Sequence, residues 1–126
     1  MRAFRELVVW QKAHHLTINV YRITKSFPRD ELYGLTSQMR RSAASVGANI
    51  AEGCGRGTPR DFARFVQVAL GSASELENQL LLARDLGLIS TSTHADLDKS
   101  VTDVKRMLTG LLRRLTADGR RLTANA

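Results

Sequence analysis

Residues 58–87, TPRDFARFVQVALGSASELENQLLLARDLG, contain the pattern that decides the fold. Apolar or small side chains recur in steps of four and three at Phe62, Val66, Ala69, Ala73, Leu76, Leu80 and Ala83. This spacing places them on one face of an α-helix, the face that a helical bundle buries. Thr58 suits the N-cap, Pro59 suits the first helical position, and Gly87 suits the residue after the helix. We therefore predict a helix over residues 59–86.

The same rhythm continues on both sides of this segment. Before it, the spacing recurs at Val9, Ala13, Leu16, Val20, Ile23 and Phe27, and after it at Leu97, Val101, Val104, Leu108, Leu111 and Leu115. A further apolar set comprises Leu32, Leu35, Met39, Val46 and Ile50, around a run of small residues. No stretch of useful length alternates with period two, as a strand would.

These patterns predict an all-α fold, an antiparallel up-down-up-down four-helix bundle in a single domain spanning residues 1–126. The predicted helices cover about residues 7–27, 30–53, 59–86 and 92–116. Residues from about 117 to 126 lose the pattern and are expected to form a frayed basic tail.

Composition excludes several classes of protein. Apolar residues make up 43% of the 126 residues and charged residues 25%, as in a globular chain. There is neither an apolar run long enough to span a membrane nor a recognisable secretory signal, so we expect a cytoplasmic protein. The single cysteine, Cys54, excludes an intramolecular disulfide and a cysteine-rich zinc site, and we expect an inert thiol.

Charge favours a polyanionic partner. Nineteen Lys and Arg residues against twelve Asp and Glu residues give a net charge of +7. Four basic residues, Lys99, Arg106, Arg113 and Arg120, are seven positions apart each time, so they share one outward face if the last helix extends that far. Arg114 and Arg121 run beside the last two. The candidate nucleic-acid-binding residues are Lys99, Lys105, Arg106, Arg113, Arg114, Arg120 and Arg121. Such a face could follow a phosphate backbone; the alternative is a solvated face whose charge serves solubility.

Several short motifs resemble those of a known bacterial family. They are Leu7-Val8-Val9-Trp10-Gln11-Lys12-Ala13, Ser26-Phe27-Pro28, Gln38-x-Arg40-Arg41, Ser45-Val46-x-x-Asn49-Ile50-Ala51-Glu52-Gly53 and Ala69-x-Gly71-Ser72-x-x-Glu75-Leu76. Over about residues 4–115 they resemble the 23S rRNA intervening-sequence proteins, which look related to the accessory variability determinant of diversity-generating retroelements. The resemblance implies an antiparallel bundle in a five-fold ring, a homopentamer that binds nucleic acid and has no established enzymatic activity. The family name does not establish rRNA as the partner.

Polar residues within these motifs form a second candidate group. If the loop near Gly55 joins antiparallel helices, Arg41 is expected opposite Ser72, and Glu75 opposite Gln38. An Arg41–Glu75 ion pair is then possible. We expect a structural polar network, fixing the register between helices or subunits, made of Gln38, Arg41, Asn49, Glu52 and Glu75. The alternative is a ligand or polyanion site lined by Arg41, Asn49 and Glu52.

Two further features concern assembly and phosphate binding. A second stripe on the first helix, with Trp10 and Tyr21, and Phe65 on the third helix exceed what a monomeric bundle buries. These three residues are candidates for an oligomer interface; the alternative is that the stripe covers the bundle edge. The loop Gly53-x-Gly55-x-Gly57 could cradle a phosphate, but it follows a helix rather than a strand, so a flexible connection is expected.

Enzymatic interpretations have little support. His14 and His15 are adjacent and point to different sides of a helix, His94 is expected in a loop or cap, and no Glu-x-x-His pair occurs. We expect no catalytic residues, no metal site and no cofactor. Two hypotheses remain. One is a ring-forming protein that binds RNA or DNA electrostatically through Arg-rich surfaces, and the other is an oligomeric scaffold or adaptor for an unidentified protein partner.

Overall fold

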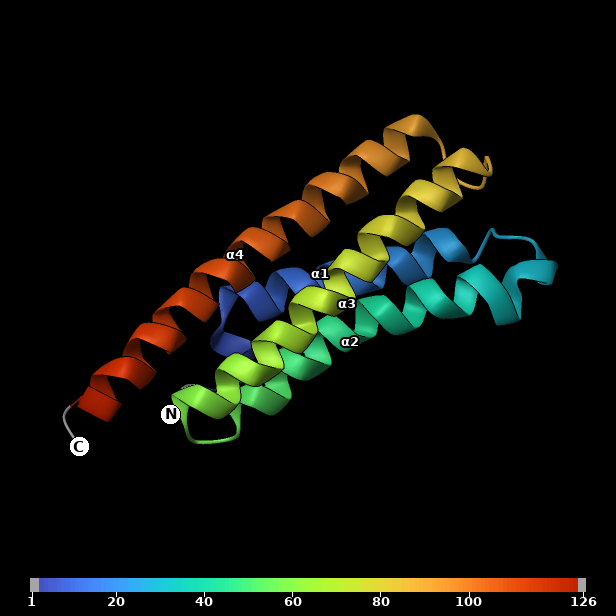
Figure 1. The fold of residues 1–126 in the computed structure, drawn as a ribbon. Helices are drawn as coiled ribbons and strands as arrows, with labels where there is room; N and C mark the ends of the chain where they lie inside the picture. Colours follow the sequence, from blue (N-terminus) through green and yellow to red (C-terminus); the bar gives the residue numbers. More distant parts are fainter. Residues whose placement is uncertain (1–2, 125–126) are drawn as a thin grey trace.

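The described part of the chain folds into four α-helices joined by short turns (Figure 1). The computed structural model describes the backbone of residues 3–124 and the side chains of residues 3–120. The helices are α1 (Val8–Thr24), α2 (Ser37–Cys54), α3 (Pro59–Asp85) and α4 (Thr91–Ala124), and no strand occurs within residues 3–124. Successive helices run in opposite directions in Figure 1. The prediction of an all-α four-helix bundle is confirmed.

The core consists of the apolar rows that the four-three spacing predicts. Buried members include Val9, Ala13, Leu16 and Val20 of α1, Met39, Val46 and Ile50 of α2, Val66, Leu76 and Leu80 of α3, and Leu97, Val101, Val104 and Leu108 of α4. Full burial of one such side chain contributes about 1.5–3 kcal/mol, so these rows hold the bundle together. Leu111 and Leu115 are only partly buried, because the second half of α4 has fewer neighbours to pack against.

The register between α2 and α3 differs from the predicted one by about one helical turn. The Ser45 and Ser72 hydroxyl oxygens lie 2.8 Å apart, and Ser42 Oγ donates to Glu75 Oε2 at 3.4 Å. Glu75 therefore lies opposite Ser42 and not opposite Gln38. The predicted register was wrong because it placed the centre of the turn too early. The hinge includes Gly57, whose φ of +87° reverses the chain just before α3.

The second helix also begins later than predicted. A 3-10 turn, η2 (Arg29–Glu31), and a π-helical turn, η3 (Leu32–Thr36), precede α2. Gly34 within η3 has non-helical angles (φ −110°, ψ −114°), so the helix cannot run straight from residue 30. Leu32 lies before this break and so does not continue the apolar face of α2. It is 44% exposed, although the sequence pattern placed it in the core.

The two ends of α3 follow the capping rules from which they were predicted, whereas α1 ends at Thr24, before the predicted residue 27. Thr58 Oγ1 accepts a hydrogen bond from the Asp61 backbone N–H at 3.2 Å, with Pro59 at the first helical position. After α3, Gly87 adopts a φ of +75°, and the Leu88 N–H bonds the Ala83 carbonyl at 2.9 Å. This pattern is a Schellman motif, which requires a left-handed residue where glycine stands.

The final helix departs from prediction at both ends. His94, expected in a loop or cap, lies in the first turn of α4 and is only 7% exposed. Its backbone N–H donates to the Ser90 carbonyl at 2.9 Å, and the Ser90 hydroxyl accepts from the Thr93 N–H at 3.0 Å. At the other end, α4 continues to Ala124 rather than ending near residue 116. No proline interrupts this stretch, and Gly119 is tolerated within it.

Candidate nucleic-acid interface

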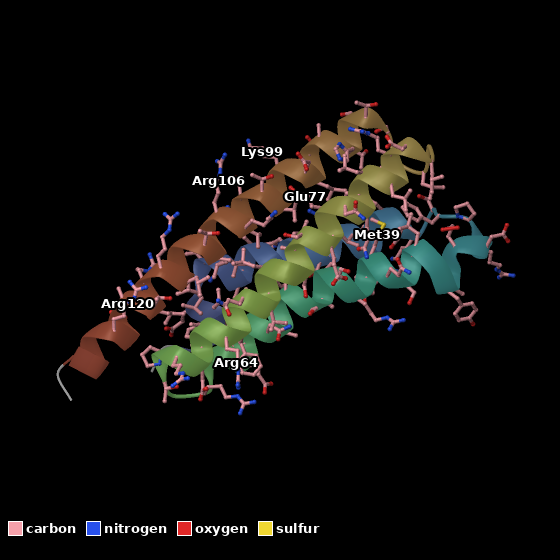
Figure 2. The ribbon with its side chains drawn as sticks, in the orientation of Figure 1. Met39, Arg64, Glu77, Lys99, Arg106 and Arg120 are labelled. Carbon is pink, nitrogen blue, oxygen red and sulfur yellow. The ribbon has the colours of Figure 1, made fainter. Side chains whose placement is uncertain are left out.

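One side of α4 carries a row of exposed basic side chains, Lys99, Arg106, Arg113 and Arg120, here called the basic row. Figure 2 shows Lys99, Arg106 and Arg120 along the outer edge of α4. Seven residues make nearly two turns, so successive members are about 10 Å apart along the helix. Among the described residues, no carboxylate forms an ion pair with Lys99, Arg106 or Arg113. Their charges are therefore available to an external anion.

The helix dipole does not account for the position of these arginines. Cations stabilise a helix C-terminus, but the effect is confined to the last turn. Because α4 continues to Ala124, Arg106 and Arg113 lie several turns before its end. Their positive charge has no capping role, which strengthens the case for a binding surface.

A pocket of about 450 Å³ lies between α3 and α4 beside the basic row. It is lined by Glu77, Thr102, Lys105, Arg106, Thr109, Gly110 and Arg113, and is here called the α3–α4 pocket. Lys105 Nζ lies 3.0 Å from Glu77 Oε1, and the two side chains are 31% and 33% exposed. Of the predicted basic residues, Lys105, Arg106 and Arg113 thus share one site, and the charge of Lys105 is partly neutralised within the chain.

The other predicted basic residues of α4 lie elsewhere. Arg114 lines a separate pocket of about 280 Å³ that also includes Leu7, Val8 and Leu111, so it faces the start of α1. Arg120 is exposed at the far end of the basic row. The side chain of Arg121 lies outside the described residues. The candidate set is therefore divided over two sides of α4.

Arginines at the α2–α3 turn are balanced by acids and stack on an aromatic ring. Arg56 pairs with Glu52 at 2.9 Å, and Arg64 approaches Asp61 at 4.0 Å. Both guanidinium carbons lie over the Phe65 ring, 4.9 and 5.7 Å from its centroid. In the basic row, by contrast, no described carboxylate pairs with Lys99, Arg106 or Arg113. The two guanidinium groups also partly cover Phe65, a candidate interface residue.

The residues predicted to form one polar network instead make separate contacts with nearby side chains and carbonyls. Asn49 Nδ2 donates to the Ser45 carbonyl and hydroxyl at 2.8 and 3.0 Å, and Arg41 donates to the Ser37 hydroxyl at 3.3 Å. The remaining contacts are the Glu52–Arg56 pair and the Ser42–Glu75 hydrogen bond. Gln38, Arg41, Glu52 and Glu75 are all exposed. The Arg41–Glu75 pair does not form within the chain, because the α2–α3 register is shifted.

The candidate interface stripe on α1 lies along its contact with α2. Trp10 stacks on His14 with ring centroids 4.8 Å apart, and Phe4 meets Trp10 edge-on at 5.0 Å. Trp10 also covers Gly47, where an added Cβ would lie 3.5 Å from its Nε1. Tyr21 is 43% exposed, with the Arg40 guanidinium 4.8 Å from its ring centroid. The stripe thus covers the α1–α2 edge and still exposes aromatic surface.

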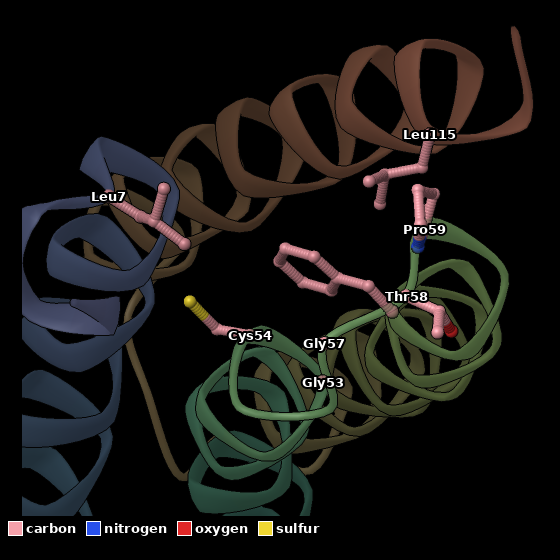
Figure 3. A pocket seen from close by; sticks show the side chains of 8 residues that line it. Leu7, Gly53, Cys54, Gly57, Thr58, Pro59 and Leu115 are labelled. Atoms are coloured by element: carbon pink, nitrogen blue, oxygen red, sulfur yellow. The ribbon is translucent and has the colours of Figure 1, made fainter. Parts of the chain in front are cut away.

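The glycine-rich loop bonds two of its backbone N–H groups within the chain, Gly55 to the Ala51 and Glu52 carbonyls and Arg56 to the Gly53 carbonyl. Figure 3 shows the pocket beside it, which has a volume of about 230 Å³ and includes Leu7, Cys54, Phe62 and Leu115 in its lining. These side chains present mainly carbon to the pocket. A phosphate ion would lose hydration there without gaining charged partners. The structure therefore gives the loop the form of an interhelical connection.

Sequence reasoning missed four residues of the α3–α4 pocket, namely Glu77, Thr102, Thr109 and Gly110. Glu77 and Lys105 are separated by 28 residues, so their pairing depends on helix register, which the sequence pattern did not give. Within the described residues, no group of three or more His, Cys, Asp or Glu side chains could hold a metal ion. Nor does any described helix combine the length and apolar character needed to cross a bilayer.

The fold and surface define a small all-α bundle protein with a basic final helix. Residues 5–110 match the family described as 23S rRNA-intervening sequence protein. The chain belongs to this family, which confirms the resemblance found in its motifs. None of the curated proteins compared with the chain matches it significantly.

A solved structure shares the fold. It is the crystal structure of a protein of unknown function from the S23 ribosomal protein family of Bacteroides thetaiotaomicron. The TM-score is 0.75, the match covers 83% of this chain and 98% of that one, and sequence identity is 23%. At this identity the likeness shows the fold alone. Neither description indicates an enzymatic activity.

Proposed function

We propose that this protein is a non-enzymatic, cytoplasmic protein that binds RNA or DNA through the basic surface of α4. The observation that carries the proposal is the basic row, whose exposed Arg106 and Arg113 have no ion-pair partner among the described residues. Neutralising a phosphate backbone releases condensed counterions, which drives binding. The net charge of +7 adds long-range attraction for a polyanion.

The distribution of charge along α4 suggests where contact is made. Asp96, Asp98 and Asp103 lie in its first half, whereas the arginines lie mainly in its second half. The sequence of α4 contains no Phe, Tyr or Trp to stack on bases. Contacts to phosphates are therefore expected to dominate, and such contacts position a nucleic acid without reading its sequence.

The family resemblance leads us to propose that the chain forms a homopentameric ring. Val68 and Leu82 of α3, and Leu86 just after its end, are 49%, 47% and 58% exposed. Another subunit that covered these side chains would remove their apolar surface from water, which favours self-association. A ring would repeat the basic row in each subunit, so that individually weak phosphate contacts add through multivalency.

A charge-reversal experiment tests nucleic-acid binding. The triple variant Arg106→Glu, Arg113→Glu, Arg114→Glu is compared with a matched triple, Arg22→Glu, Arg29→Glu, Arg60→Glu, at other exposed arginines. Affinity for a labelled structured RNA and for a duplex DNA is measured from low to physiological salt, with mass recorded by light scattering.

Loss of binding in the α4 triple alone, with mass unchanged, supports the proposed surface. Equal losses in both triples would mean that net charge acts without a defined surface, and an unaltered affinity in the α4 triple would remove this surface from the proposal.

The second candidate function is an oligomeric scaffold or adaptor with a protein partner. The observation that favours it is the exposure of large apolar side chains, including Tyr33 at 93% and Leu86 at 58%. If wild-type binding to both nucleic acids disappears by physiological salt while the oligomer persists, this function is favoured over the first.

A further inference from the structure

We infer that the α3–α4 pocket binds a phosphate group and that Glu77 limits its affinity by holding Lys105 in an internal ion pair. The inference rests on the proposed function where the phosphate belongs to a nucleic-acid backbone. A free inorganic phosphate or pyrophosphate would be recognised by the same donors, and the experiment below separates these two sources.

The charged donors of the pocket all come from α4, and α3 contributes the carboxylate of Glu77. Arg106 and Arg113 line it from α4, and each presents a guanidinium that can bind two phosphate oxygens at once. Both side chains are exposed and have no carboxylate partner among the described residues. Lys105 lies in the same pocket and supplies a third positive charge when it is released from Glu77.

Two threonines add neutral donors. Helical threonines commonly donate to the carbonyl four residues earlier, as Thr17, Thr24 and Thr116 do here at 2.7–2.9 Å. No such hydrogen bond is found for Thr102 or Thr109 within the described part of the chain, although both line the pocket. Their hydroxyls are therefore available to a phosphate oxygen.

Gly110 lines the pocket without a side chain. Glycine within a helix is unfavourable relative to alanine, so a mid-helix glycine calls for a reason. Close packing within the chain does not require glycine here, because a Cβ added at residue 110 would meet nothing within 4 Å. The missing side chain instead lets a ligand approach the α4 backbone between Arg106 and Arg113.

Glu77 opposes this binding in two ways. Its carboxylate lies 3.0 Å from Lys105 Nζ and neutralises that charge, and it would repel an incoming phosphate. An ion pair that is about one-third exposed is weak enough for a phosphate to displace it. Glu77 is therefore the residue that sets how tightly the pocket holds an anion.

The test compares Glu77→Gln with Glu52→Gln. Both variants remove one negative charge, and both release a basic side chain from an ion pair, Lys105 in one and Arg56 in the other. The probes are inorganic pyrophosphate and an RNA duplex. We expect Glu77→Gln to bind both probes about three- to tenfold tighter than wild type. For RNA, the slope of log K against log salt should steepen by about 0.7–0.9, because Lys105 gains a phosphate contact. The Glu52→Gln variant should change less than twofold.

A second variant separates binding from folding. Gly110→Leu fills the pocket with a residue that favours helix, so its thermal stability should equal or exceed that of wild type. Its affinity for both probes should nevertheless fall at least threefold. Amide shifts of Thr109 and Gly110 on titrating pyrophosphate into the wild-type protein would place the ion in the pocket.

The outcomes distinguish this inference from the proposed function. If RNA binds but Glu77→Gln is no tighter than Glu52→Gln for either probe, the pocket is overturned and nucleic-acid binding stands. If pyrophosphate shifts the pocket amides and binds Glu77→Gln more tightly than wild type, while neither the RNA nor the duplex DNA of the charge-reversal experiment binds, the proposed function fails and free phosphate is the source. Undiminished binding by Gly110→Leu would also overturn the pocket.

Discussion

Gly53 of α2 lies so close to α3 that a Cβ added to it would be 2.8 Å from the Cβ of Phe65. The same added atom would be 2.8 Å from Cδ1 of Phe62. Both distances are shorter than carbon atoms in contact allow, so only glycine permits the two helices to approach at this point. The contact sits next to the α2–α3 turn and fixes the distance between these helices where they begin to pair.

Gly53→Ala should therefore destabilise the fold. The added methyl group must push Phe62 or the α3 backbone outward, and such overpacking typically costs about 1–3 kcal/mol. The free energy of unfolding, measured by urea titration with circular dichroism, is the appropriate readout.

Gly71→Ala is the matched control. Gly71 lies within α3, and a Cβ there would meet nothing within 4 Å. Alanine should stabilise the helix by about 0.5–1 kcal/mol. A Gly53→Ala variant as stable as Gly71→Ala would contradict the close approach seen in the structure.

Features set by local chemistry were predictable from the sequence. The apolar rows gave the core, because a 3.6-residue period needs no knowledge of the neighbouring helices. Thr58 and Gly87 gave the ends of α3, because capping depends on the few residues around it. The family resemblance was recognisable for the same reason, since its motifs are short and in sequence order.

The register between two helices and the irregular turn before α2 were not predictable from the sequence pattern. The pairing of Ser45 with Ser72 depends on where the turn reverses, and an error of one turn changes every partner. The chain kinks within Leu32–Thr36, where Gly34 has non-helical backbone angles that the apolar pattern does not reveal. The basic row of the candidate site was visible in the sequence, whereas Glu77 entered the site only through the α3–α4 register.

Gly87→Ala should weaken the end of α3. The residue has a φ of +75°, a conformation that disfavours any Cβ by about 1–2 kcal/mol. A Cβ there would meet nothing within 4 Å, so the expected loss of stability comes from the backbone alone. Gly87→Asn, which tolerates left-handed angles better, should recover part of the loss in the same urea titration; equal stability of all three proteins would argue against the Schellman motif.

Trp10→Ala should weaken the proposed homo-oligomer. Trp10 lies half-buried on the α1–α2 edge, stacked on His14, and its exposed surface is part of the candidate interface. Mass measured by light scattering across a dilution series should fall, while helix content by circular dichroism is retained. Lys12→Ala is the control, because Lys12 is exposed on α1 and lies outside the stripe that contains Trp10 and Tyr21. Unchanged mass for Trp10→Ala would exclude this stripe from the interface.

Single neutral substitutions in the basic row should lower the salt dependence of nucleic-acid binding by a fixed increment. Each lost phosphate contact reduces the slope of log K against log salt by about 0.9 for duplex DNA and about 0.7 for a single strand. Arg106→Gln and Arg113→Gln should each show this change. The double variant should show twice the change if the two arginines contact separate phosphates, and less than twice if they share the phosphate of the α3–α4 pocket.

Arg22→Gln provides the comparison, since Arg22 is exposed on α1 and lies outside the basic row. Its slope should match that of wild type, because a residue that contacts no phosphate releases no counterion. If all three single variants change the slope equally, the nucleic acid would be responding to total charge. A difference confined to Arg106 and Arg113 would instead place the phosphate backbone along α4.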